Sequence, residues 1–129
     1  LDLDRFKSLN DNFGHVEGDR ALTVLADCLR AETRSRDVIG RYGGEEFLVV
    51  LPECDVDLGL QVAERIRQRL ERRGIPVDPA GTPLTVSVGL AVRHRGEGVT
   101  ALIERADQAM YEAKNSGRNW VALASSQPG

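Results

Sequence analysis

The sequence contains little of several features that mark common classes of protein. Its 129 residues include only two cysteines, which excludes a disulfide-stabilised secreted domain. Cys28 and Cys54 also lack the spacing and the further partners of a zinc site, so we expect both to be packing thiols. The longest apolar run, residues 47–51, is far shorter than the ~20 residues that span a bilayer. We therefore expect no membrane insertion and no direct membrane contact.

An excess of positive charge is also lacking. The chain has 17 Lys and Arg residues against 20 Asp and Glu residues, which gives a formal net charge of −3. Generic nucleic-acid binders carry excess positive charge, because it displaces counterions from the phosphates. We therefore expect no nucleic-acid partner, and any anion site must be local. The hydrophobic share of 41% is too high for a disordered chain and fits one globular domain.

The two ends of the chain differ from the rest. Residues 1–4 read like the end of a strand and include no initiator Met, so we expect an N-terminally truncated domain over residues 1–124. Residues 125–129 have the composition of a flexible tail. The low cysteine usage and the absence of a signal peptide predict a cytoplasmic location.

Hydrophobic periodicity predicts three amphipathic helices. Apolar side chains recur at helical spacing within residues 22–29, 62–70 and 102–113. We expect Asp55 and Thr100 to be the N-caps of the second and third helices, because their side chains can accept a hydrogen bond from a free helical N–H. Gly74 and Gly117 follow helical segments at positions where a left-handed C-cap is expected.

Strand patterns lie between these helices, over residues 38–42, 47–51, 84–92 and 120–123. Gly43 and Gly44 separate the first two strands, and glycines can take the positive φ values that a tight hairpin turn requires. We therefore expect a mixed α/β (α+β) fold. Its central sheet would contain parallel and antiparallel strands with flanking helices, in a ferredoxin-like βαβ topology that a hairpin interrupts.

Two clusters of acidic residues are candidates for a metal site. Asp2 and Asp4 alternate at the end of the first strand and so share one face, and Lys7 follows on the next element. The hairpin tip, residues 43–46, places two acidic residues after two glycines. Each cluster alone also fits a solvated loop. Together, carboxylates from neighbouring strands offer the hard oxygen ligands that hold Mg²⁺ against a substrate phosphate.

A third charged cluster places Lys114 and Arg118 at a helix C-terminus. Cations at such a position complement the helix dipole, which accounts for them without any ligand. They also suit a phosphate clamp, because a metal held by carboxylates leaves other phosphate oxygens to be neutralised. The pattern by itself is compatible with both interpretations.

Several separated motifs, in order along nearly the whole chain, resemble those of the GGDEF domain, the domain of bacterial diguanylate cyclases. These motifs are residues 2–11, 14–15, 18–19, 41–47, 87–89, 106–111, 113–114 and 117–119. Glu45 stands where the family name has Asp, so the chain carries the GGEEF variant. The resemblance implies a fold like the palm of nucleotidyl cyclases, in which the inserted hairpin carries GGEEF.

The resemblance implies that Asp2 and Glu45 bind the catalytic Mg²⁺ or Mn²⁺ ions with help from the Leu3 carbonyl. It also implies that Glu46 positions the nucleotide and supports the metal. Asp2, Glu45 and Glu46 are therefore the candidate catalytic residues.

The resemblance also implies a GTP site, formed by Phe6, Lys7, Asn10, Asp19, Gly43, Gly44, Lys114 and Arg118. The first two match a turn whose backbone amides hold phosphates, and the last two match the triphosphate clamp. Asn10 and Asp19 match positions that read guanine. A carboxylate can accept from guanine N1–H and from the exocyclic amine, which adenine does not offer in the same pattern.

The implied reaction is the condensation of two GTP molecules into cyclic di-GMP and two pyrophosphates, a nucleotidyltransferase step in bacterial second-messenger signalling. A 3′-hydroxyl of one GTP attacks the α-phosphorus of the other, twice. One site holds one GTP, so a cyclic product requires two facing sites, which a homodimer supplies. The family also implies an upstream sensor domain in the parent protein, which can be membrane-bound with this domain on its cytoplasmic side.

Arg34 and Asp37 match the family's R-x-x-D inhibitory motif. Arginine can bind guanine O6 and N7 in a bidentate manner while aspartate takes the donor edge, so we expect allosteric product binding by these two residues. Arg65 either joins them from the neighbouring helix or lies on a solvated helix face.

The chain departs from the family at its beginning, because members carry a leading helix and most of the first strand before Asp2. Part of the nucleotide pocket wall would then be open. Two functions follow from the sequence: an active diguanylate cyclase, or a catalytically impaired module that binds cyclic di-GMP for regulation.

Overall fold

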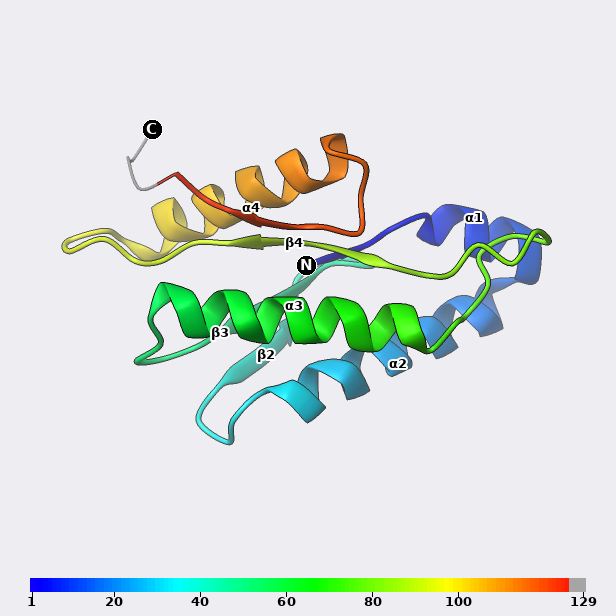
Figure 1. The fold of residues 1–129 in the computed structure, drawn as a ribbon, viewed down its shortest axis with the longest axis horizontal. Helices are drawn as coiled ribbons and strands as arrows, with labels where there is room; N and C mark the ends of the chain where they lie inside the picture. The colour runs from blue at the N-terminus through cyan, green and yellow to red at the C-terminus, as the bar shows by residue number, and fades with distance from the viewer. Residues whose placement is uncertain (126–129) are drawn as a thin grey trace.

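The structure is a computed structural model that describes residues 1–125, so the tail predicted at residues 125–129 lies almost entirely outside the described residues. The chain contains both strands and helices, with two consecutive helices and a two-stranded hairpin in its first half (Figure 1). The elements are β1 (Asp2–Leu3), α1 (Phe6–Phe13), α2 (His15–Glu32), β2 (Val38–Arg41), β3 (Phe47–Val50), α3 (Val56–Arg72), β4 (Val86–Leu90), α4 (Val99–Asn115) and β5 (Val121–Leu123). The predicted mixed α/β fold with an inserted hairpin is confirmed.

β1 lies at the centre of the strand arrangement. On one side it pairs antiparallel with β4, and β4 pairs parallel with β5. On its other side lies the antiparallel β2–β3 hairpin. The Phe47 N–H donates to the Leu1 carbonyl at 2.8 Å, and the Leu3 N–H donates to the Glu45 carbonyl at 3.2 Å. The strand end that carries Asp2 is therefore held between the hairpin and β4.

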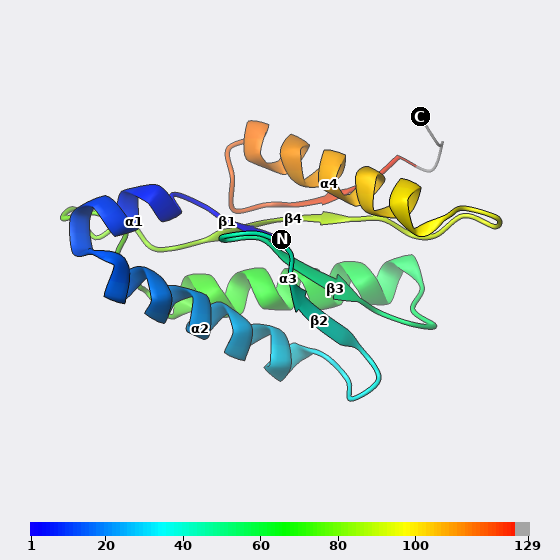
Figure 2. The ribbon, with the colours of Figure 1, turned by 180° about the vertical axis from the view of Figure 1, so that it is seen from behind.

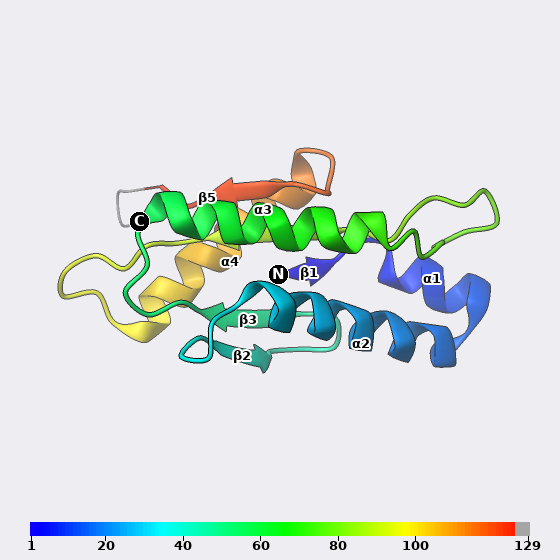
Figure 3. The same ribbon diagram turned by 60° about the horizontal axis from the view of Figure 1, so that its bottom comes forward.

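Helices cover both faces of this sheet. α2 and α3 pack on one face and α4 on the other, as the two opposite views show (Figures 1 and 2). Figure 3 shows β1 in the space between α2 and α3, with the hairpin beside α2. The core between these layers includes the fully buried leucines Leu9, Leu25, Leu29, Leu70 and Leu84. Burial of these side chains fixes β1 and the residues that follow it.

The helix boundaries confirm some predictions and correct others. Asp55 caps α3 as predicted, because its Oδ1 accepts from the Leu58 N–H at 2.8 Å. Gly74 and Gly117 have positive φ values of 63° and 107° just past α3 and α4, as predicted. The described residues contain no helix with the length and apolar character needed to cross a bilayer.

Two helix predictions are wrong. The prediction of three helices misses α1, because its eight residues are fewer than the roughly 11–18 over which helical periodicity is read. Thr100 is not an N-cap, since Gly98 precedes α4 and Thr100 lies within its first turn. The cysteines are free: Cys28 is buried as expected of a packing thiol, and Cys54 is half-buried.

The hairpin turn also differs from the prediction. Residues 42–46 separate β2 from β3, and neither Gly43 nor Gly44 has a positive φ. The Tyr42 and Gly43 N–H groups both donate to the Glu46 carbonyl, at 2.8 and 3.2 Å, so the chain reverses over residues 43–46 without a left-handed residue. The Arg41 guanidinium folds over the tip instead, and its Nη2 donates to the Gly44 carbonyl at 2.6 Å.

Candidate active site at the end of the first strand

The side chain of Lys114 reaches the end of β1 from the last turn of α4. Its Nζ lies 3.1 Å from Asp2 Oδ1, 3.1 Å from the Leu3 carbonyl oxygen and 2.8 Å from Asp4 Oδ1. Lys114 and Asp4 are 110 positions apart in the chain. They meet because α4 packs on β4, which is paired with β1. The structure thus brings together a predicted clamp cation and the strand-end carboxylates.

The oxygen atoms at this point have the chemistry of a divalent-ion site. Asp2 Oδ1 and the Leu3 carbonyl both face one cationic nitrogen, and hard oxygen donors are the ligands that Mg²⁺ and Mn²⁺ prefer. Glu45 lies on the adjoining hairpin, paired through its backbone with Leu3. Within residues 1–125, no three His, Cys, Asp or Glu side chains gather as a metal-binding group. A metal here would therefore need the backbone carbonyl and substrate oxygens in addition to carboxylates.

Glu46 lies directly opposite Asp2, where the hairpin meets β1. Together with Asp107 of α4 it lines a cavity of 560 Å³ between β3, β4 and α4. Burial raises the pKa of Glu46 above its ordinary value, and the neighbouring carboxyl groups of Asp107 and Asp2 raise it further. The 106–111 motif contains Asp107, but nothing in that pattern indicates that this side chain faces the hairpin.

The predicted phosphate-binding turn is the N-terminus of α1. The chain reverses at Arg5, which has a φ of 58°, and α1 begins at Phe6. The first N–H groups of a helix have no partner within the helix, and Arg5 supplies no side-chain cap. The amides of Phe6 and Lys7 are therefore placed to bind an anion, directly after the strand end that holds Lys114.

The two predicted guanine-reading residues lie on contacting helices, α1 and α2. Asn10 Oδ1 is buried and, within the described part of the chain, has no hydrogen-bond partner. It lies so close to Gly18 that a Cβ there would be only 1.9 Å away. Asp19 is the next residue, and it is exposed. A free acceptor beside an exposed carboxylate suits the N–H donors of a guanine edge.

Arg118, the other clamp candidate, is exposed on the turn that follows α4. Gly44 at the hairpin tip is also open, because a Cβ built on it meets nothing within 4 Å. A Cβ on Gly43 would meet only the Glu46 side chain, at 3.5 Å. The tip therefore leaves room for a ligand beside the backbone.

Arg34 and Asp37 of the predicted inhibitory motif bind each other. Arg34 Nη2 lies 2.8 Å from Asp37 Oδ1, and the Arg34 backbone N–H donates to Asp37 Oδ2 at 2.6 Å. The Arg34 hydrogen bonds hold the pKa of Asp37 below its ordinary value. The Asp37 side chain is 2% exposed and that of Arg34 35% exposed, so a ligand reaches the arginine first.

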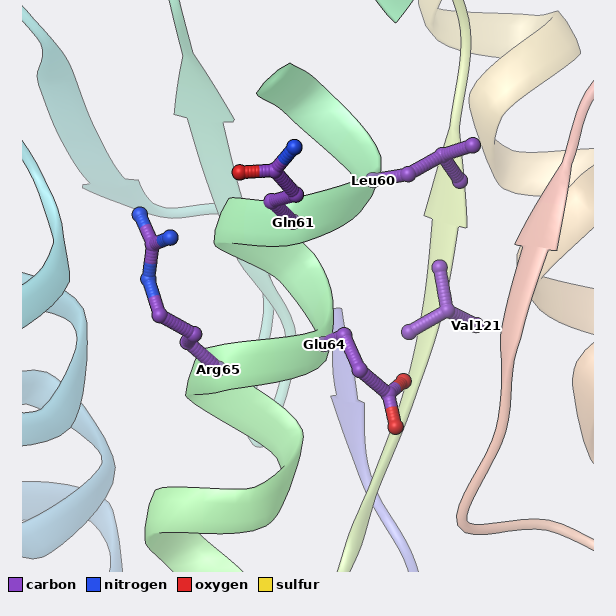
Figure 4. A pocket seen from close by; sticks show the side chains of 5 residues that line it. All are labelled: Leu60, Gln61, Glu64, Arg65 and Val121. Atoms are coloured by element: carbon purple, nitrogen blue, oxygen red, sulfur yellow. The ribbon is translucent and has the colours of Figure 1, made fainter. Parts of the chain in front are cut away.

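Arg65 lies near this motif without contacting it. Its Nε is 3.2 Å from Glu32 Oε2, at the end of α2 and two residues before Arg34. Figure 4 shows Arg65 pointing toward α2, whereas Glu64 and Val121 lie on the other side of α3. This position of Arg65 is compatible with both interpretations, a solvated helix face and a part in the inhibitory site.

Comparison with known proteins identifies a family that this chain matches. A family model described as "Diguanylate cyclase, GGDEF domain" matches residues 1–120. Diguanylate cyclase A of Treponema denticola is 40% identical over 125 residues, which make up 96% of this chain and 34% of that protein. The chain therefore spans about a third of the length of this curated relative.

Solved structures agree with this match. The coiled coil and GGDEF domain of DgcB from Caulobacter crescentus, in complex with c-di-GMP, superpose with a TM-score of 0.88 at 32% identity, over 95% of this chain and 66% of that chain. The active GGEEF domain of a diguanylate cyclase from Vibrio cholerae gives a TM-score of 0.87 at 34% identity, over 98% of this chain and 80% of that chain.

Proposed function

This chain belongs to the family of diguanylate cyclase GGDEF domains, and from this premise we propose that it condenses two GTP molecules into cyclic di-GMP and two pyrophosphates. One observation carries the proposal: Asp2, the Leu3 carbonyl and Lys114 meet at one point beside the GGEEF hairpin. Oxygen ligands for a metal and a cation for phosphate are what phosphoryl transfer requires of a protein.

Each predicted residue then has a role in holding GTP. Asp2, Glu45 and the Leu3 carbonyl would hold Mg²⁺ or Mn²⁺, which when bound neutralises charge on the phosphate. The amides of Phe6 and Lys7 would hold phosphate oxygens at the α1 N-terminus.

The nucleotide would be fixed at both of its ends. Asn10 and Asp19 would accept hydrogen bonds from the guanine base, and Lys114 and Arg118 would neutralise the triphosphate. Fixing both ends orients the α-phosphorus toward the incoming 3′-hydroxyl. Glu46 lies beside this point and would position the nucleotide from the hairpin.

The complete reaction would take place in a homodimer. Each protomer has one such site, and a cyclic product needs two GTP molecules facing each other. The parent protein would supply a sensor that controls this pairing on the cytoplasmic side, where GTP is available.

Product inhibition at Arg34 and Asp37 is part of the same proposal. The bidentate guanidinium that now binds Asp37 has the geometry to bind guanine O6 and N7. The c-di-GMP complex of the related DgcB domain supports this. It also supports the second candidate function, a regulatory module that binds cyclic di-GMP without turnover.

An assay of pyrophosphate release from GTP in the presence of Mg²⁺ tests the proposal. Glu45→Gln removes a metal carboxylate at constant size, so we expect turnover to fall by at least about 100-fold. Glu53→Gln is the matched control, because this carboxylate is 83% exposed and its ion pair with Arg36 spans 3.4 Å. Equal turnover in the two variants would contradict the assignment of Glu45. Cyclic di-GMP binding without turnover in the unaltered protein would favour the regulatory module.

A further inference from the structure

A buried carboxylate, that of Asp4, binds the clamp cation Lys114 and the turn that carries Arg118. Asp4 is only 1% exposed. Its Oδ1 accepts from Ser87 Oγ at 2.7 Å and from Lys114 Nζ at 2.8 Å. Its Oδ2 accepts from Thr85 Oγ1 at 2.7 Å and from the Asn119 N–H at 3.0 Å. Each oxygen therefore has two donors, which uses the full acceptor capacity of an ionised carboxylate.

These contacts compensate for the burial of the Asp4 carboxylate. Burial by itself raises the pKa of such a group, but the hydrogen bonds from Lys114, Ser87, Thr85 and Asn119 outweigh burial and lower the pKa of Asp4. A buried charge is costly unless it is paired and fully hydrogen-bonded. Two of the four donors, Lys114 and the Asn119 N–H, belong to the segment over residues 114–119 that carries both clamp cations.

Asn119 connects Asp4 to the second cation. Arg118 and Asn119 have φ values of 66° and 50°, a left-handed conformation that is uncommon outside glycine. The Asn119 N–H is held by Asp4. The Asn119 side chain accepts from Arg67 Nη1 at 2.8 Å and donates to Glu71 Oε2 at 2.7 Å, both on α3. Arg118 therefore extends toward solvent from an anchored turn.

We propose that Asp4 is a positioning residue that aims both clamp cations at the triphosphate of the bound nucleotide. It acts on Lys114 through a direct ion pair and on Arg118 through the Asn119 N–H. This inference rests on the proposed function, because it takes the two cations to be phosphate ligands. Since Asp4 acts through these two cations, its effect should depend on the number of phosphates and not on the base.

Nucleotide binding by an Asp4→Asn variant tests this inference. The amide keeps the size of the side chain but removes its charge. It also replaces one acceptor oxygen by an NH₂ donor, and this donor then faces either the Lys114 ammonium or the Asn119 N–H. We expect the affinity for a non-hydrolysable GTP analogue with Mg²⁺ to fall about tenfold or more. The affinity for GMP should change less than about twofold, since GMP lacks the phosphates that the clamp would bind. Titration calorimetry measures both affinities.

Ser87→Ala is the matched control. It removes a neutral donor from the same buried carboxylate but leaves Lys114 and Asn119 in place, so the preference for the GTP analogue over GMP should persist. The inference is overturned if Asp4→Asn leaves that preference unchanged, or if it weakens both nucleotides equally. A lack of preference in the unaltered protein would instead contradict the proposed function.

A second comparison applies if Asp4→Asn does not fold, as judged by circular dichroism. Lys114→Met removes the half-buried ammonium, so the amide that Asp4→Asn introduces no longer faces an unpaired cation. Adding Asp4→Asn to Lys114→Met should lower the affinity for the GTP analogue further, through Arg118, but by less than it does alone. Equal affinity with and without Asp4→Asn in that background would show that Asp4 does not control Arg118.

Discussion

Acidic side chains of this chain lie in two opposite electrostatic environments. Asp4 and Asp37 are hydrogen-bonded to Lys114 and Arg34, and their pKa values are lowered. Glu46 is buried beside other carboxyl groups, and its pKa is raised. The two lowered groups stabilise the fold above their unfolded pKa values, and this stability is lost as the pH falls through their folded values. The raised pKa of Glu46 has the opposite effect, because stability is then lost as the pH rises.

The pH dependence of Glu46 is testable through Asp107→Asn. Because the folded-state pKa of Glu46 lies above its unfolded value, stability falls as the pH rises from the unfolded to the folded value. Asp107→Asn removes one neighbouring charge, so the variant should have the higher Tm at neutral pH. The difference should disappear near pH 4, about the ordinary pKa of Glu, because Glu46 is then protonated.

Thermal melting across this pH range measures the effect. Asp11→Asn serves as control, because Asp11 is an exposed residue of α1 and should give no such pH-dependent difference. A Tm difference for Asp107→Asn that stays constant with pH would contradict the prediction.

Arg34 and Arg36 offer a matched pair for the inhibitory site. Arg34→Ala removes the cation that pairs with Asp37 and should weaken cyclic di-GMP binding by about tenfold or more, because bidentate arginine contacts are strong. Arg36→Ala removes an exposed cation whose ion pair with Glu53 spans 3.4 Å, and should change this affinity far less. Titration with cyclic di-GMP measures the affinity of both variants. Equal affinities would mean that cyclic di-GMP does not bind at Arg34.

At the scale of elements, the close approach of α4 to β4 decides where Lys114 lies. Gly89 of β4 makes this approach possible. A Cβ on Gly89 would be 2.1 Å from the Ala106 carbonyl oxygen and 2.3 Å from the Met110 nitrogen, both in the backbone of α4. Backbone atoms of a packed helix cannot move aside independently, so any side chain at this position would displace the whole helix.

Gly89→Ala should therefore destabilise the protein by about 1–3 kcal/mol. It should also weaken GTP binding, because displacement of α4 moves Lys114. Gly40→Ala in β2 is the control, since a Cβ there meets nothing within 4 Å. Chemical denaturation gives the free energies of unfolding. Equal stability of the two variants would mean that α4 does not pack as tightly as described.

At the scale of the whole molecule, the proposed reaction needs two copies of a site that each protomer has once. Activity per protomer should therefore rise with protein concentration and level off when the homodimer is saturated. Glu45→Gln protein added in excess should lower the activity of the unaltered protein, because mixed dimers contain one impaired site. A dilution series of pyrophosphate release measures both effects. Activity strictly proportional to concentration, with no loss on adding the Glu45→Gln protein, would indicate that the monomer suffices.

The sequence alone was enough to predict the fold class and the hairpin, and it named the residues of the candidate site. Asp2, Glu45 and Lys114 could be named because they lie in motifs whose spacing is local and readable along the chain. The cap at Asp55 and the left-handed glycines after α3 and α4 depend on neighbouring residues in the same way.

The surroundings of these residues depend on the tertiary structure. The bonds of Asp4 to Thr85 and to Asn119 join positions 81 and 115 residues apart, and the approach of Asp107 to Glu46 likewise joins separate elements. Burial and proximity set the charge state and direction of a side chain, and both arise only when distant segments pack together. Motif spacing therefore identified the residues, and the packing of α4 on β4 decided which groups hold them in place.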